Sequence, residues 1–204
     1  SIDNLDTAPF PSNKIVCREP EISDLFKYVC AWDGTKKLRN KKHIICISGY
    51  GGIGKTSLVL EFVLQLLSKM KHLGFRPSFI LFYSAKEQML DINEETGSIK
   101  KKRLKSQFHG LDTFKALLFN DLEISDFNDY WKTEGLIIVD NLESLNTNER
   151  KRVVDFLYEE LPSSVQAIIT TRIPENDVDY SMPINGFRNE AGITFIKQYS
   201  IQNK

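Results

Sequence analysis

Short apolar runs rich in β-branched residues recur along the chain and predict buried strands. They span residues 43–48, 78–84, 136–140, 165–170 and a shorter segment at 180–184. Between them, apolar residues return at helical spacing in segments that begin near Glu19, Lys55, Leu111 and Asn146, and a last helix is expected over 189–199. Strands that alternate with helices form a mostly parallel sheet with helices on both faces. The pattern therefore predicts an α/β fold.

Two segments fall outside this alternation. Residues 1–14 contain two prolines and little periodicity, which favours an arm or linker before a domain that spans residues 15–186. Residues 87–107 are polar and charged, and a solvated helix or a mobile loop is expected there. The marked basic run of the chain lies in this segment and consists of Lys100, Lys101, Lys102, Arg103 and Lys105. A nucleic-acid contact is the alternative interpretation, but no aromatic residues are interleaved with the basic ones.

The connection from the first predicted strand into its helix matches a phosphate-binding loop. Residues 49–56 read Gly-Tyr-Gly-Gly-Ile-Gly-Lys-Thr, which fits Gly-x-x-x-x-Gly-Lys-Thr without a mismatch. The glycines allow backbone conformations closed to other residues, so that N–H groups come close to phosphate oxygens. The start of the helix adds a partial positive charge. Lys55 would then reach the terminal phosphates, and the hydroxyl of Thr56 would ligate Mg²⁺.

Two more polar residues come at the ends of predicted strands. Asp140 closes the run at 136–140, and Arg172 follows the run at 165–170 after one further threonine. Ligands of such sheets bind beyond the carboxyl ends of the strands, so both side chains are expected on the same rim as the phosphate loop. A carboxylate opposite the phosphates supplies a second anchor for Mg²⁺. An ordinary strand that happens to end in Asp is the alternative.

Composition narrows the range of partners. Lys+Arg and Asp+Glu both number 27, so no global charge favours nucleic acid or an anionic membrane. No apolar run is long enough to span a bilayer and no signal peptide is evident at the start, which favours a cytoplasmic protein.

Cys17, Cys30 and Cys46 lack the spacing of a zinc site, so reduced thiols are expected, with Cys46 buried in its strand. The chain does not begin with Met, so a piece of a longer polypeptide is expected.

Four motifs, taken in order, carry a family resemblance. Residues 16–19 (Val-Cys-Arg-Glu) resemble an entry motif of the form hydrophobic-Gly-Arg-Glu, with Cys17 where Gly is usual. Residues 51–56 resemble a Gly-Gly-Ile-Gly-Lys-Thr phosphate loop, residues 138–143 (Ile-Val-Asp-Asn-Leu-Glu) an Asp-Asn-x-Glu form of Walker B, and residues 169–172 a Thr-Thr-Arg sensor. Together these motifs resemble the STAND class of nucleotide-binding switches, specifically the NB-ARC and NACHT-like ATPases. The likeness covers nearly the whole chain after the arm.

The resemblance implies a fold and a set of roles. The implied fold is a three-layer P-loop NTPase of the ASCE or AAA+-like type, with a mostly parallel five-stranded sheet whose sensor strand lies between the Walker A and Walker B strands. The implied cofactors are ATP or ADP and Mg²⁺. Residues 187–204 would begin a truncated helical lid. The implied contacts are Val16 and Arg18 near the nucleoside; Gly49, Gly51, Gly52, Ile53, Gly54, Lys55, Thr56 and Ser57 in the phosphate loop; Thr56 and Asp140 on Mg²⁺; and Arg172 on the γ-phosphate.

One departure from fast ATPases bears on catalysis. Such enzymes usually place an acid directly after the Walker B Asp to orient the attacking water, and here that position is Asn141. An amide cannot accept a proton as a carboxylate can. Glu143 is the candidate substitute, and slow hydrolysis is expected.

Three functions follow from these patterns. The first is a nucleotide-dependent switch in which ADP holds a larger protein closed and ATP opens it for assembly with its own copies, with effector and sensor domains elsewhere in that protein. For bacterial members of the class, defence against phage or regulation of transcription is the expected setting. The second is an AAA+-like ATPase with ordinary turnover, and the third is an interaction scaffold with a vestigial nucleotide site. Neither a membrane nor a nucleic acid is expected as a partner.

Overall fold

The computed structural model describes residues 2–10, 18–36, 38, 41–71, 73, 75–86, 89–92, 99–102, 106–127 and 133–186, with the backbone alone at 89–92 and 99–102. In chain order the elements are β1 (Ile2–Asp3), η1 (Leu5–Thr7), α1 (Glu19–Val29), β2 (Ile44–Ser48), α2 (Lys55–Lys69), β3 (Phe79–Ser84), β4 (Met89–Ile92), β5 (Ile99–Lys102), α3 (Leu111–Leu122), β6 (Gly135–Asp140), η3 (Leu142–Ser144), α4 (Thr147–Glu159), β7 (Val165–Thr171) and β8 (Tyr180–Pro183). Strands and helices alternate as the sequence predicts, apart from β1, the β4–β5 pair and β8, which follows β7 without a helix between them.

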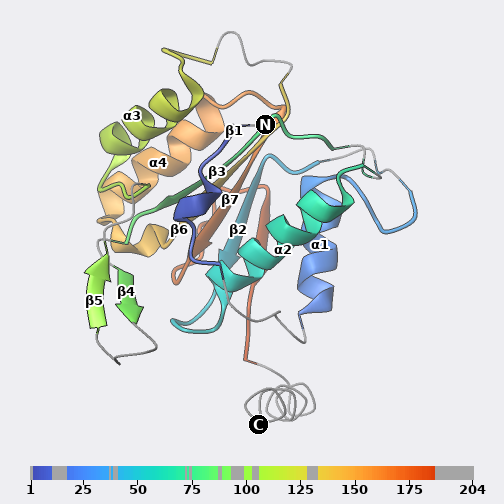
Figure 1. The fold of residues 1–204 in the computed structure, drawn as a ribbon, viewed down its shortest axis with the longest axis horizontal. Helices are drawn as coiled ribbons and strands as arrows, with labels where there is room; N and C mark the ends of the chain where they lie inside the picture. The colour runs from blue at the N-terminus through green and yellow to red at the C-terminus, as the bar shows by residue number, and fades with distance from the viewer. Residues whose placement is uncertain are drawn as a thin grey trace.

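A six-stranded parallel sheet forms the centre of the molecule, in the order β1-β3-β6-β7-β2-β8 (Figure 1). The strand that carries the expected sensor, β7, lies between β2 and β6, as the resemblance implies. The register pairs Ser48 with Thr171 and Ser84 with Asp140. The carboxyl ends of β2, β3, β6 and β7 therefore meet at one edge of the sheet, where ligands of parallel sheets bind.

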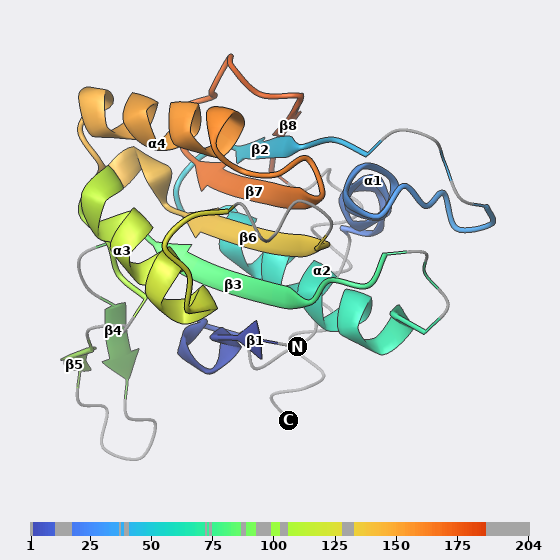
Figure 2. The same ribbon diagram turned by 90° about the horizontal axis from the view of Figure 1, so that it is seen from above.

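Each face of the sheet is buried under a pair of helices, which gives three layers (Figures 1 and 2). Side chains alternate along β6, where Leu136 and Ile138 face the cluster under α1 and α2, and Ile137 and Val139 face the cluster under α3 and α4. All of these side chains are fully buried. Burial on both faces explains why the strands appear in the sequence as continuous apolar runs.

The expected count of five strands is wrong, because Ile2–Asp3 adds a sixth at the edge of the sheet. The next residue, Asn4, extends this edge with its side chain: Nδ2 donates to the carbonyl of Phe82 (3.2 Å), and the Phe82 amide donates to Oδ1 (2.7 Å). The same Nδ2 donates to Asp121 on α3 (3.0 Å). Two residues are too short for a periodicity signal, which is why the sequence pattern predicts only an arm there.

The charged segment after β3 contains an antiparallel hairpin, not the expected solvated helix or mobile loop. β4 and β5 pair in a register that sets Asp91 opposite Lys100, and they form a sheet of their own beside the main one (Figure 2). The hairpin is built from backbone hydrogen bonds between two strands, which charge content does not reveal.

Several local predictions are confirmed. Asn146 caps α4, since its Oδ1 accepts from the amide of Glu149 (3.0 Å). The first helix begins at Glu19 as predicted and ends at Val29, shortly before Ala31 takes a left-handed conformation (φ 52°). Cys46 is buried and free, as is Cys30, and burial raises the pKa of Cys46 to about 11.

Three sequence expectations fall on residues outside the described set. These are the entry-motif residues Val16 and Cys17, the helix at 189–199 and the lid at 187–204. Within the part of the chain that the structure describes, no helix is long and apolar enough to cross a membrane.

The contact between Gly135 and Phe79 gives a test of the sheet register. These residues are cross-strand partners, and a Cβ at Gly135 would lie 2.1 Å from the Phe79 ring. Gly135→Ala should therefore lower the free energy of unfolding by about 1–3 kcal/mol through overpacking. Gly186→Ala is the matched control, because a Cβ there meets nothing within 4 Å, and it should change stability by less than about 0.5 kcal/mol. Equal denaturant midpoints for the two variants would contradict the register.

Candidate nucleotide-binding site

Between β2 and α2, the chain forms a glycine-rich loop at the carboxyl edge of the sheet. Gly52 (φ 78°) and Gly54 (φ 92°) both take left-handed conformations, and α2 begins directly after Gly54. A side chain at either position would strain the backbone. Backbone amides of such a loop at the start of a helix can stabilise an anion.

Lys55, the first residue of α2, folds back over this loop. Its ammonium group donates to the carbonyls of Gly49 (2.9 Å) and Tyr50 (3.0 Å). Although the residue is only 7% exposed, no carboxylate lies within ion-pair distance among the described residues, and burial lowers the pKa of Lys55. An anion in the loop would offer this ammonium a stronger partner than two carbonyls.

A buried carboxylate lies opposite the loop. Asp140, at the end of β6, is 2% exposed. Its Oδ1 accepts from the hydroxyls of Thr56 on α2 (2.7 Å) and Thr170 on β7 (2.6 Å), and its Oδ2 accepts from the side-chain amide of Asn141. Burial raises the pKa of Asp140 despite the two hydroxyl donors. Hydroxyl and amide donors alone thus compensate this charge incompletely.

Asn141 follows Asp140 in a left-handed conformation (φ 57°, ψ 42°), which Asn tolerates better than most residues. Its backbone amide donates to the hydroxyl of Thr170 (3.1 Å). The side-chain amide of Asn141 thus donates to Asp140, and its backbone amide donates to Thr170. Asn141 acts here as a structural partner of the carboxylate.

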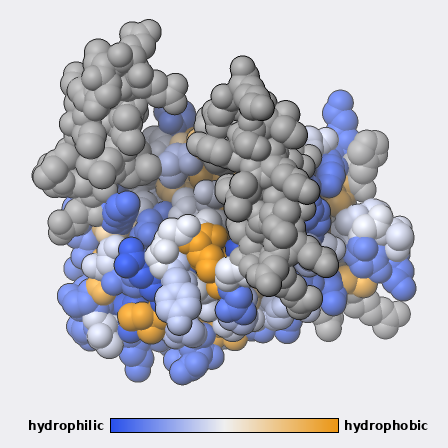
Figure 3. All heavy atoms as spheres, turned by 90° about the horizontal axis from the view of Figure 1, so that it is seen from below, coloured by the Kyte–Doolittle hydropathy of each residue, from blue (hydrophilic) through white to orange (hydrophobic). Residues whose placement is uncertain are grey.

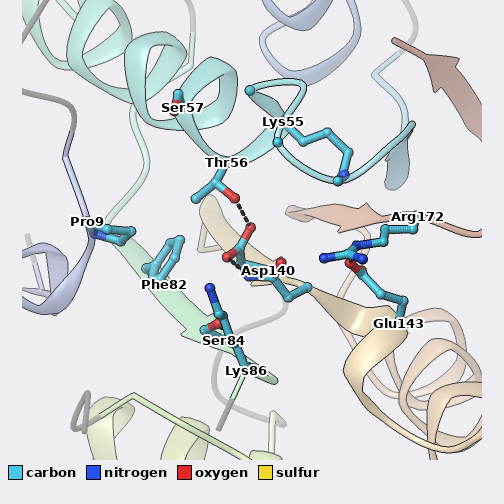
Figure 4. Close-up of a pocket in the computed structure, with 14 residues that line it drawn as sticks. Pro9, Lys55, Thr56, Ser57, Phe82, Ser84, Lys86, Asp140, Glu143 and Arg172 are labelled. Atoms are coloured by element: carbon cyan, nitrogen blue, oxygen red, sulfur yellow. Dashed lines mark hydrogen bonds and ion pairs between the residues drawn. The ribbon is translucent and has the colours of Figure 1, made fainter. Parts of the chain in front are cut away.

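Glu143 and Arg172 form an ion pair across the mouth of the site (Figure 4). Arg172 Nε lies 3.0 Å from Glu143 Oε1. The two side chains differ in environment, since that of Glu143 is 11% exposed and that of Arg172 is 64% exposed. The other oxygen of Glu143, Oε2, is buried and has no hydrogen-bond partner among the described residues. The guanidinium lies against Gly51, where a Cβ would come within 2.9 Å of Cζ.

Arg18 lies to one side of this group. It is buried and bridges two elements: Nη1 pairs with Glu21 (2.8 Å), and Nη2 donates to the carbonyl of Asn185 (3.0 Å) and approaches that of Ile53 (3.5 Å). Ile53 packs its side chain against the core under α1 and α2. The structure therefore places both residues behind the loop, and the implied contact of Arg18 with a nucleoside and that of Ile53 within a phosphate-binding loop remain predictions.

A cavity of about 330 Å³ joins the remaining candidates (Figure 4). The predicted residues that line it are Gly51, Gly52, Gly54, Lys55, Thr56, Ser57, Asp140, Asn141, Glu143 and Arg172. It is also lined by Pro9, Phe82, Ser84 and Lys86, none of which the motifs single out. Ser84 ends β3, so the rule about carboxyl ends of strands could have identified that side of the cavity. No local signal in the sequence points to Pro9, which the edge strand β1 brings there.

These groups fit a polyphosphate with a divalent cation. Thr56 and Asp140 present oxygen atoms to the same point, and the cation would compensate the buried carboxylate. No cluster of three or more His, Cys, Asp or Glu side chains suited to a metal occurs in the described ranges. Mg²⁺ is usually held by one or two carboxylates together with substrate phosphates and water, and Asp140 could be such a carboxylate.

The buried carboxylate of Asp140 should lower the stability of the fold while it contributes to the binding of Mg²⁺ and nucleotide. A carboxyl group whose pKa is raised on folding binds more protons in the native state, so its contribution to stability falls as the pH rises above its ordinary pKa. Asp140→Asn should therefore unfold at the same or a higher temperature than the wild-type chain at pH 7 without ligand. The same variant should lose any stabilisation by Mg²⁺ and nucleotide.

Asp155→Asn on α4 controls for the change of charge and should leave both quantities unaltered. A marked fall in the melting temperature of ligand-free Asp140→Asn would contradict the interpretation, because it would mean that the carboxylate is well compensated.

Comparison with known proteins shows no match to a family model and none to a curated protein. Among solved structures, the chain resembles the Orc1 protein of Aeropyrum pernix in complex with DNA, at 13% identity over 97% of this chain and 53% of that chain, with a TM-score of 0.59. It also resembles Cdc6p of Pyrobaculum aerophilum, at 14% identity over 96% and 52% of the two chains, with a TM-score of 0.52. The chain spans about half the length of these proteins. At such low identity the likeness concerns the fold alone, which is a mostly parallel α/β fold.

Proposed function

We propose that this chain is the nucleotide-binding domain of a STAND-type switch, which binds ADP or Mg-ATP and hydrolyses ATP slowly. The observation that carries the proposal is the convergence of Lys55, Thr56, Asp140 and Arg172 on one cavity, from the start of α2, the end of β6 and the residue after β7. In the proposed complex the loop amides and Lys55 bind the phosphates. Mg²⁺, held by Thr56 and Asp140, would supply charge neutralisation between the phosphates.

The ion pair between Glu143 and Arg172 supports a switch in particular. Arg172 is the more exposed partner and already lies against the loop at Gly51. A γ-phosphate would compete with Glu143 for the guanidinium, since a planar fork grips phosphate and carboxylate equally well. ADP offers no such group, so the two nucleotides favour different arrangements of Arg172. A ligand shifts a conformational equilibrium only through a difference of this kind.

The surroundings of Asp140 support slow hydrolysis. Asn141 uses its amide to hold Asp140 and offers no base. Glu143 is engaged by Arg172, so it would have to leave this ion pair before it could orient an attacking water. Release of this pair by a γ-phosphate would therefore come before water activation.

The proposed parent protein assembles with its own copies in the ATP state and carries effector and sensor domains elsewhere, in a setting such as phage defence or transcriptional regulation. Residues 15–186 would form the nucleotide-binding domain and 187–204 the start of its lid. The expectation that nucleic acid is not a partner lacks support, since the similar Orc1 structure contains DNA.

Two other functions compete with the switch. Ordinary ATPase turnover would appear as sustained phosphate release by the chain alone, and it would require Glu143 to act as the base. A scaffold with a vestigial site would show the same melting temperature with and without Mg-ATP, because only a ligand that binds the native state raises it.

Lys55→Ala tests the site itself. Loss of the ammonium should weaken the binding of both ADP and ATP by at least about tenfold, the equivalent of one charge-assisted hydrogen bond. The fold should persist, because the amine contacts only loop carbonyls. Calorimetric titration with each nucleotide gives the affinities, and circular dichroism checks the fold. Unchanged ADP affinity would refute the assignment of the loop.

Arg172→Ala tests the γ-phosphate sensor. The variant should bind a non-hydrolysable ATP analogue about tenfold more weakly while its ADP affinity stays within about twofold. The matched control is Arg150→Ala, whose guanidinium pairs with Glu175 and which does not line the cavity. Equal losses for the two nucleotides would show that Arg172 does not distinguish them.

A further inference from the structure

The cavity continues past Thr56 and Asp140 to the end of β3, where a basic residue remains outside the proposed roles. Lys86 lies two residues after β3 and lines the cavity. Its amine is on the same side of Asp140 as Phe82 and Ser84, away from Arg172 (Figure 4). Seen from below, the described surface is mainly hydrophilic and its hydrophobic residues form small separate groups, which suits a charged ligand more than an apolar partner (Figure 3).

The order of the strands places Lys86 and Arg172 on either side of Asp140. β6 lies between β3 and β7, so Lys86 and Arg172 follow the two strands that flank Asp140. Adjacent strands are about 4.8 Å apart. A group bound above Asp140 therefore lies between Lys86 and Arg172, within reach of both long side chains.

The backbone beneath Lys86 is tied to the same strand as Asp140. The amide of Ala85 donates to the carbonyl of Asp140 (2.9 Å), and the amide of Lys86 donates to the hydroxyl of Ser84 (3.3 Å). Ser84 is itself held by hydrogen bonds with Ser106 and Phe108. The side chain of Lys86 thus starts from a fixed point beside the carboxylate.

The three basic side chains that line the cavity differ in the contacts that they already make. Lys55 donates to loop carbonyls and Arg172 pairs with Glu143. The amine of Lys86 has neither a hydrogen bond nor an ion pair among the described residues, although it lies in the same cavity. It can therefore meet an incoming anion without first breaking an existing contact.

We propose that Lys86 is a further nucleotide-binding residue, which contacts the terminal phosphate of a bound nucleoside triphosphate from the β3 side. This inference rests on the proposed function and adds a second element of selectivity for triphosphates. Lys86 would draw the γ-phosphate in while Arg172 is still paired with Glu143, and Arg172 would then change partner. A diphosphate bound in the loop would leave Lys86 in solvent.

The test uses calorimetric titration of the whole chain in Mg²⁺ buffer with ADP and with an ATP analogue that has a β,γ-imido linkage. Lys86→Gln should weaken binding of the analogue about tenfold and leave ADP affinity within about twofold. Lys86→Arg keeps the charge and should retain most of the affinity for the analogue. Lys151→Gln on the exposed side of α4 removes the same charge far from the cavity lining and should match the wild-type chain for both ligands.

The outcomes separate this inference from the function on which it rests. If the wild-type chain binds both nucleotides and depends on Lys55, but Lys86→Gln changes neither affinity or both equally, the role of Lys86 is overturned and the nucleotide site stands. If the wild-type chain binds neither nucleotide, the proposed function and the role of Lys86 both fail. A loss for the analogue that Lys86→Arg does not restore would also overturn a contact that depends on charge.

Discussion

The candidate site depends on one buried carboxylate at the edge of a parallel sheet. Asp140 accepts hydrogen bonds from the first turn of α2 and from β7, and its backbone carbonyl accepts from the residue after β3. Three neighbouring elements are thus positioned by a single residue on β6. Because β6 lies between β3 and β7, this arrangement follows directly from the strand order. The same residue is costly to bury without a cation, so the contact that aligns the site also favours occupation of it.

An ion pair between Glu143 and Arg172 lies in the same cavity as Asp140. Glu143 pairs with Arg172, whose guanidinium lies against the glycine-rich loop. Within the described part of the chain, the buried Oε2 of Glu143 has no hydrogen-bond partner, so this carboxylate is compensated through its other oxygen. An ion pair with one exposed partner is well suited to exchange, since solvent already screens the guanidinium. The geometry thus combines a rigid anchor at Asp140 with a replaceable contact at Arg172.

How much the sequence can predict differs between the centre of the fold and its periphery. Strands buried on both faces leave continuous apolar runs, and the loop at 49–56 has a spacing that few other structures share, so β2, β3, β6, β7 and the rim were predictable. The edge strand β1 was not, because two residues carry no periodicity and Asn4 extends the edge through a side chain. The β4–β5 hairpin was missed because charge content masks backbone pairing.

The same distinction applies within the site. Residues that act through a motif, such as Lys55 and Thr56, are found by spacing alone. The pairing of Glu143 with Arg172 joins residues 29 positions apart in the chain (172 − 143) and depends on the lengths of their side chains and on the absence of a Cβ at Gly51. The motifs assign each of these residues a role toward a ligand. They do not predict that the two side chains pair with each other. Contacts between motif residues, such as this ion pair, are not part of the motif. Those contacts arise from tertiary geometry, so they become visible only when the strand order and the side-chain positions are known.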